Sequence, residues 1–330
     1  MTLTRRTLGL AGLSGLGLTS CAPRPSAQGR TIFDAVDVHP GDFPTVTAVR
    51  WMGDELGRLT DGRLGIRQYP SGQLGSEDDS IGLARHGAID ICRVAVAALN
   101  NAFPETQLLA LPYVYRDVAH VRAVVDGEIG TELLNVFEGR GLVGLAYYDA
   151  APRCFYNVHH PVTEPGQLHG LKMRAPQSDI FLDSIRAMGA NPTPLSFGAI
   201  FSSLQTHLID GAENNWPAYQ SSRQFEVARF WSQTEHSFSP DALLISRASL
   251  ERLGPADRDL VRDVARRSVQ VMRTDWDRRE AEARAAVIAA GVQVAAVDKA
   301  AFAATVRPVL DKYLSEPRLR ALHERIAAVA

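Results

Sequence analysis

Short strand-like segments alternate with helix-like segments along most of this 330-residue chain. Residues 32–38 and 64–69 have the apolar content of strands, and residues 46–59 between them carry apolar side chains at steps of three and four, as one face of a helix does. Strands that alternate with helices of this length predict an α/β fold with mostly parallel sheet. Further strands are expected at 89–94, 142–148, 153–157 and 171–175, and further helices at 76–86, 117–137 (a pair), 178–188 and 197–208.

The longest uninterrupted segment runs from Pro255 to residue 290 without a further Gly or Pro. Roughly 36 residues of helix at about 1.5 Å each would span about 54 Å, which is more than the width of one ordinary domain. Its apolar residues do not keep a strict heptad, so a coiled coil is not favoured. Because the chain length fits roughly two domains and no low-complexity linker separates them, we predict that strands and this helix cross between two domains.

The first 20 residues have the pattern of an export signal. Arg5 and Arg6 precede an uncharged Leu- and Gly-rich run that is too short and too Gly-rich for a stable membrane span. The four residues that end at Cys21 resemble a lipobox, and the arginine pair resembles a twin-arginine signal. We therefore predict an export signal over 1–20, a linker over 21–30 and a lipid anchor on Cys21. General secretion, and a soluble protein cleaved a few residues later, are the alternatives.

Composition and motifs exclude several function classes. A formal net charge of -2 is far from the basic excess of a general nucleic-acid-binding protein. The mature sequence carries no GxGxxG after a strand, no GxxxxGK[ST], no HExxH and no GxSxG. Asp37 and His39 form a short pair that is too common to predict a metal site, and no Cys/His spacing suits zinc. We predict no cofactor and no metal, and leave open whether Cys92 and Cys154 form a disulfide.

Polar side chains stand at or near the ends of several predicted strands, where ligands bind in open α/β sheets. Arg93 and Arg174 lie in otherwise apolar strands, and a buried arginine needs an acidic partner. That partner is either an acid of the chain, such as Asp90 for Arg93, or a ligand. Glu77 opens a predicted helix, where negative charge favours the positive end of the helix dipole. The candidates at strand ends are His39, Arg93, Arg153, Arg174, Asn214 and Asn215.

Five segments follow one another in a specific order along the chain. They are Tyr69-Pro-Ser-Gly-Gln-Leu-Gly75 with Glu77, Gly87-Ala-Ile-Asp90, Leu108-Leu-Ala-Leu-Pro-Tyr113, Gly170-Leu-Lys-Met-Arg174, and Leu204 through Asn214. Taken together, over nearly the whole mature chain, they resemble the extracytoplasmic substrate-binding proteins of TRAP (tripartite ATP-independent periplasmic) transporters.

The resemblance implies a periplasmic-binding-protein (Venus-flytrap) fold. Two α/β lobes joined by hinge strands would close over an organic acid, and the long helix would brace both lobes. The expected division gives residues 31–151 plus about 238–270 to lobe I, and residues 152–237 plus about 271–330 to lobe II.

The resemblance also implies roles for three residues. Arg174 ends the Gly-Leu-Lys-Met-Arg strand and matches the arginine that binds the ligand carboxylate. Its fork of donors fits a carboxylate bidentately, which Lys172 could not reproduce. Arg153 matches a second frequent contact, and Asn214 matches the asparagine of the family's Gly-x-Glu-Asn segment.

Where many members of the family have Glu-Asn-Pro, this chain has Glu213-Asn214-Asn215-Trp216-Pro217. Together with Asp37-Val-His39-Pro and Arg93, this segment resembles the branch that binds hexuronates such as glucuronate and galacturonate. Trp216 or Phe155 would give an apolar face for the sugar ring, although Trp216 could instead pack at the hinge. Hydrogen bonds would come from His39, Glu77, Arg93, Asn214 and Asn215.

We therefore predict a periplasmic protein, anchored to a membrane by lipid, that captures a sugar acid and delivers it to a TRAP membrane permease without covalent chemistry. A C4-dicarboxylate or another hydroxy or keto acid is the alternative ligand. An exported enzyme acting on acidic sugars, with Glu77 and His39 as acid and base, is the alternative from another class.

Overall fold

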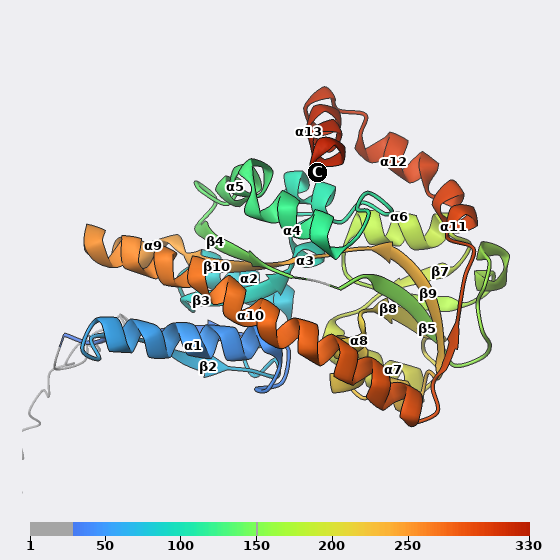
Figure 1. Cartoon of the computed structure of the whole chain (residues 1–330), viewed down its shortest axis with the longest axis horizontal. Helices are drawn as coiled ribbons and strands as arrows, with labels where there is room; N and C mark the ends of the chain where they lie inside the picture. Colours follow the sequence, from blue (N-terminus) through green and yellow to red (C-terminus); the bar gives the residue numbers. More distant parts are fainter. Residues whose placement is uncertain (1–28, 150) are drawn as a thin grey trace, which may run out of the picture.

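The computed structural model describes residues 29–149 and 151–330. The predicted export signal, Cys21 and most of the predicted linker lie outside the described residues. The described chain forms two β-sheets, one in each half of the molecule (Figure 1). We call the half with the five-stranded sheet the first lobe and the half with the six-stranded sheet the second lobe.

The first sheet has the strand order β2-β1-β3-β10-β4. β1 (Thr31–Val36) runs parallel to β2 (Leu64–Tyr69) and β3 (Ile91–Ala95), and β10 (Asp241–Ser246) lies antiparallel between β3 and β4 (Leu142–Tyr148). The helices of this lobe are α1 (Pro44–Leu59), α2 (Glu77–Arg85), α3 (Val96–Leu99), η1 (Pro104–Leu109), α4 (Val118–Asp126), α5 (Glu128–Asn135) and α9 (Arg247–Glu251).

Local sequence explains the helices that flank the first sheet. α1 buries its apolar face, including Val46 and Met52, in one core with the strand residue Phe33. α2 begins with a capping box, in which the Ser76 hydroxyl accepts a hydrogen bond from the Asp79 backbone N–H and the Asp79 carboxylate accepts one from the Ser76 backbone N–H. The capping box makes Glu77 the first residue of the helix.

The second sheet has the strand order β11-β9-β5-β8-β6-β7. Its strands are β5 (Arg153–Asn157), β6 (Lys172–Ala175), β7 (Asn191–Pro194), β8 (Gly211–Asn214), β9 (Phe230–Ser237) and β11 (Gln293–Ala295). β6 is parallel to β7 and β8, whereas β5 is antiparallel to β8 and β9. The helices between them are η2 (Pro165–Leu168), α6 (Asp179–Ala187), η3 (Phe197–Ala199), α7 (Ile200–Gln205), α8 (Trp216–Ser221) and η4 (Gln224–Glu226).

The chain crosses between the lobes in strands and in one long helix. β4 of the first lobe leads to β5 of the second, and β9 of the second leads to β10 of the first. α10 (Pro255–Ala289) follows and runs along both lobes (Figure 1). Its residues Val264 and Trp276 lie in a first-lobe core, and Ala283 and Val287 lie in a second-lobe core. This architecture confirms the predicted two-lobed α/β fold with a helix that spans both lobes.

The C-terminal segment differs from the expected division, which places everything after about residue 271 in lobe II. α11 (Lys299–Thr305) and α12 (Arg307–Tyr313) pack on the second lobe, against β9 and α6. α13 (Pro317–Ala328) instead packs on α5 and η1 of the first lobe. There the Ile326 carbonyl lies 2.9 Å from Nε2 of His120. The apolar stripe of α13, Leu319, Leu322 and Ile326, is buried there in one core with first-lobe residues such as Val124 and Leu133.

Within the described residues, no helix is both long enough and apolar enough to cross a membrane. Cys92 and Cys154, the two cysteines in this part of the chain, are both free and buried. Cys92 lies in β3 of the first sheet and Cys154 in β5 of the second. Burial raises the pKa of the Cys92 thiol to about 12, so this thiol stays protonated at neutral pH.

Candidate functional site

A cavity lies between the two lobes. It is lined from the first lobe by residues near the ends of β1 and β3, and from the second lobe by residues of β5, β6 and β8. All seven predicted site residues line this one cavity: His39, Glu77, Arg93, Arg153, Arg174, Asn214 and Asn215. Polar side chains separated by up to 176 positions in sequence are therefore brought together where strands end.

Arg174 is a buried cation without a carboxylate partner among the described residues. Arg174 lies in β6, and its side chain is buried, with 5% of the residue exposed. Its Nε donates a hydrogen bond to the Leu195 carbonyl at 2.8 Å. Burial lowers the pKa of Arg174, but a guanidinium group stays charged in proteins. The terminal nitrogens of Arg174 are thus available to an anion that enters the cavity.

Arg153 differs from Arg174 because it is already paired inside the protein. Its Nε lies 2.5 Å from one carboxylate oxygen of Glu213, and a terminal nitrogen lies 2.8 Å from the other. Glu213 is fully buried. Burial alone would raise the Glu213 pKa, but Arg153 and His236 outweigh it and lower this pKa to about 2. The pair is therefore ionised at neutral pH.

Arg93 lies among three carboxylates of the first lobe. Its Nε donates to Asp37 at 2.9 Å, and one terminal nitrogen lies 3.1 Å from Glu77 and 3.4 Å from Asp241. The other terminal nitrogen donates to Asp37 as well. The expectation of an acidic partner within the chain is thus met, although not by the residue we named.

The prediction that Asp90 is the partner of Arg93 is wrong. Asp90 accepts hydrogen bonds from the Asp34 backbone N–H, Ser249 and Arg252. Asp90 lies directly before β3 and Arg93 lies within it, and along extended backbone the side chains of residues three apart point to opposite faces. Asp90 and Arg93 are three residues apart, so their side chains contact different parts of the protein.

His39 is a neutral imidazole at the first-lobe side of the cavity. Burial and the nearby Arg93 charge lower its pKa to about 3. The ring stacks on Phe43 with centroids 3.8 Å apart, and Phe197 meets it edge-on at 5.0 Å. Nδ1 is buried without a hydrogen-bond partner in the described structure. A neutral imidazole suits a ligand hydroxyl, which can both donate and accept.

Backbone hydrogen bonds orient the amides of Asn214 and Asn215. The Asn214 side-chain oxygen accepts from the Asn215 backbone N–H at 2.9 Å. The Asn215 side-chain oxygen caps α8 by accepting from the Ala218 backbone N–H, also at 2.9 Å. Both residues line the cavity, and the NH₂ group of each makes no hydrogen bond within the described residues.

Sequence reasoning missed several cavity residues and misplaced the aromatic lining. The residues it missed include Phe197, Ser239, Asp241 and Trp276. The residues that line the cavity do not include Trp216, whose ring stacks on Trp231 with centroids 3.7 Å apart, nor Phe155, which stacks on His236. Asp241 left one signal in the sequence, since it directly precedes an apolar run.

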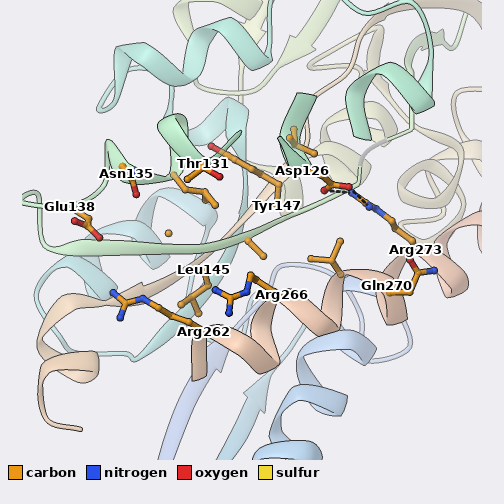
Figure 2. A pocket seen from close by; sticks show the side chains of 15 residues that line it. Asp126, Thr131, Asn135, Glu138, Leu145, Tyr147, Arg262, Arg266, Gln270 and Arg273 are labelled. Atoms are coloured by element: carbon orange, nitrogen blue, oxygen red, sulfur yellow. Dashed lines mark hydrogen bonds and ion pairs between the residues drawn. The ribbon is translucent and has the colours of Figure 1, made fainter. Parts of the chain in front are cut away.

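A larger cavity lies between α5, β4 and α10 (Figure 2). None of the predicted site residues lines it. Arg273 lines this cavity and forms ion pairs with Asp126, at 2.7 Å, and with Asp149. Because its lining comes from the first lobe and α10, this cavity is not the one between the lobes. The described residues contain no cluster of three or more His, Cys, Asp or Glu that could hold a metal ion.

Asp241 should make the stability of the protein depend on pH. Burial raises its pKa from 3.8 to about 7, and the charges of Glu77 and Asp37 add to the rise while Arg93 and Arg153 oppose it. Because the folded pKa lies above the unfolded value, Asp241 stabilises the fold fully below pH 3.8 and loses that contribution as pH rises through 7.

We therefore expect an Asp241→Asn variant to gain stability relative to the wild type as pH rises. The stability difference between variant and wild type should be about 2 kcal/mol more favourable to the variant at pH 8 than at pH 5. Denaturant titration at both pH values measures it. A difference that is equal at the two pH values would show that Asp241 does not titrate between them.

Comparison with known proteins gives consistent matches over most of the chain. Residues 35–316 match the family described as bacterial extracellular solute-binding protein, family 7 (DctP). A solute-binding protein of Chromohalobacter salexigens is 33% identical over 288 residues, which are 87% of this chain and 86% of the relative.

Solved structures also match. A TRAP periplasmic solute binding protein from Bradyrhizobium sp. BTAi1, in complex with α/β-D-galacturonate, is 47% identical with a TM-score of 0.89, covering 90% of this chain and 99% of the other. A TRAP periplasmic solute binding protein from Pseudomonas putida F1, with bound D-glucuronate, is 34% identical with a TM-score of 0.88, covering 91% and 97%.

Proposed function

Because the chain belongs to family 7 of the bacterial extracellular solute-binding proteins, we propose that it captures a hexuronate, D-galacturonate or D-glucuronate, in the cavity between its lobes. The family consists of binding proteins of transporters rather than enzymes. Two similar structures hold these two sugar acids, which supports the ligand class. The captured acid is then delivered to the membrane permease of a TRAP transporter.

The observation that carries the proposal is the unpaired, buried Arg174. A buried charge without a partner is costly, so a site that keeps one is suited to a ligand of opposite charge. The Arg174 guanidinium group binds the ligand carboxylate through two parallel hydrogen bonds. Exclusion of water from the closed cavity strengthens this ion pair.

The remaining polar groups bind the hydroxyls of the sugar. The NH₂ groups of Asn214 and Asn215 donate to ring or hydroxyl oxygens, and the His39 imidazole accepts from or donates to a hydroxyl. The carboxylates of Glu77 and Asp241 accept from hydroxyls on the first-lobe side. Phe197 and Trp276 provide the apolar contacts for the ring.

The predicted export signal and lipid anchor complete the proposal. Residues 1–20 direct the chain to the periplasm, and Cys21 carries the lipid that holds it at a membrane. Conversion of Cys21 to serine should release the protein from the membrane fraction into the soluble periplasmic fraction.

Titration calorimetry of the mature protein tests the ligand. We expect one molecule of galacturonate or glucuronate to bind per chain, and galactose, which has a similar ring without the carboxylate, to bind at least about 100-fold more weakly. Binding confined to C4-dicarboxylates or to other hydroxy or keto acids would keep the transporter class and replace the ligand. Conversion of a uronate to a product during the titration would point to the enzyme alternative.

A further inference from the structure

Charge is distributed unequally between the two walls of the cavity. The second lobe contributes the guanidinium groups of Arg153 and Arg174 and the carboxylate of Glu213. The first lobe contributes a single guanidinium group, that of Arg93, with three carboxylates around it. These three belong to Asp37, Glu77 and Asp241. One wall thus carries an excess of positive charge and the wall opposite an excess of negative charge.

The single arginine of the first-lobe wall is already surrounded by carboxylates of the chain. Arg93 is 2% exposed, and Asp37 occupies its Nε and one terminal nitrogen. Glu77 accepts from the other terminal nitrogen at 3.1 Å, and Asp241 lies 3.4 Å from the same atom. A carboxylate that reached this wall would find carboxylates already in place around the guanidinium group.

The acids of this wall are suited to hydroxyl donors instead. Glu77 uses one oxygen to accept from Arg93 and from the Ala95 backbone N–H, which leaves its second oxygen without a partner in the described structure. One oxygen of Asp241 lies 3.4 Å from a terminal nitrogen of Arg93. Both residues line the cavity. A sugar hydroxyl can donate to such oxygens, whereas a second ligand carboxylate has no proton to donate and is repelled.

We propose that Glu77 and Asp241 are specificity-determining residues that restrict the site to ligands with one carboxylate, rejecting acids that carry a second carboxylate at the opposite end. The inference rests on the proposed function, because it takes the Arg174 side as the position of the first carboxylate. It also accounts for the preference for a sugar acid over a dicarboxylate through repulsion, and not only through added contacts.

Two six-carbon acids that differ in one group provide the test. Galactarate has a carboxylate at both ends of the chain, and D-galactonate has a hydroxymethyl group at one end. Each acid is used to displace galacturonate in titration calorimetry at pH 8, where Asp241, with a pKa of about 7, is ionised. For the wild type we expect galactonate to bind at least about 30-fold more tightly than galactarate. In Asp241→Asn, and separately in Glu77→Gln, this ratio should fall at least about tenfold, since each variant removes one negative charge from the acidic wall.

Asp54→Asn is the matched control, because it makes the same change of charge at an exposed position of α1. Its galactonate-to-galactarate ratio should equal that of the wild type. Equal binding of the two acids to the wild type, or an unchanged ratio in both variants, would overturn the inference. It is also overturned if neither acid displaces galacturonate from any of these proteins, since the shape of the ring and not charge would then select the ligand. Failure of galacturonate itself to bind would instead refute the proposed function.

Discussion

An Arg174→Met variant is expected to bind galacturonate at least about 100-fold more weakly than the wild type. Truncating one partner of a buried, hydrogen-bonded charge pair costs about 2–5 kcal/mol or more, because the other charge is left without its counterion. In this cavity the ligand carboxylate would lose its bidentate donor, and Arg153 could not replace it while bound to Glu213. Titration calorimetry with the wild type and the variant measures the ratio.

The same variant should fold as well as the wild type. Arg174 has no carboxylate partner in the described structure, and burial disfavours its charged form, so an apolar side chain of similar length removes a cost. We expect the Tm without ligand to be unchanged or higher, and the rise of Tm on adding galacturonate to disappear. This combination separates a lost contact from a lost fold.

Two further variants sharpen the interpretation. Arg174→Lys keeps the charge but not the planar fork of donors, so its affinity should lie between those of the wild type and Arg174→Met. Arg186→Met changes an exposed arginine of the same lobe, and its affinity should be that of the wild type. If Arg174→Met bound galacturonate within about fivefold of the wild type, the carboxylate would have to be held elsewhere, contrary to the cost expected for a buried charge pair.

The parts of the fold that follow from local sequence were predictable. The absence of Gly and Pro between Pro255 and Gly291 predicts one helix, and α10 ends one residue before the predicted end. The parts that depend on distant pairing were not. The stripe of Leu319, Leu322 and Ile326 shows that α13 must bury a face, but nothing in its own sequence tells which lobe will cover it.

The candidate site also contains residues that the sequence predicts and residues that it does not. Arg174 and Asn214 could be placed because each follows an apolar strand and falls in a segment that resembles a known family. Asp241 could not, because we predicted no strand where β10 lies. A short apolar run such as 242–245 fits a buried helix as well as a buried strand. The three acids around Arg93 come from three separate elements, so their meeting is a property of the folded structure.

A Glu213→Gln variant is expected to destabilise the protein by about 2–4 kcal/mol at neutral pH. Glutamine keeps the size of the side chain but removes the charge that neutralises Arg153, which is 6% exposed. Leaving one member of a buried ion pair uncompensated costs about 3–5 kcal/mol, and the remaining amide hydrogen bond offsets part of this. Denaturant titration of the two proteins at pH 7 measures the difference.

The loss should depend on pH with a definite sign. The folded pKa of Glu213, about 2, lies below its ordinary value of 4.5. The contribution of Glu213 is therefore fully present above pH 4.5 and is lost as pH falls through 2. The wild type and Glu213→Gln should accordingly approach equal stability in acid.

Two comparisons distinguish a buried ion pair from a general effect of removing charge. Glu226→Gln breaks an exposed pair with Arg223 in the same lobe and should change Tm little, because solvent already screens that pair. The double variant Arg153→Met/Glu213→Gln removes both buried charges and should be more stable than Glu213→Gln alone. If the double variant were less stable than the single one, Arg153 would contribute to the fold through its packing rather than through its charge, and the cost of Glu213→Gln would need another cause.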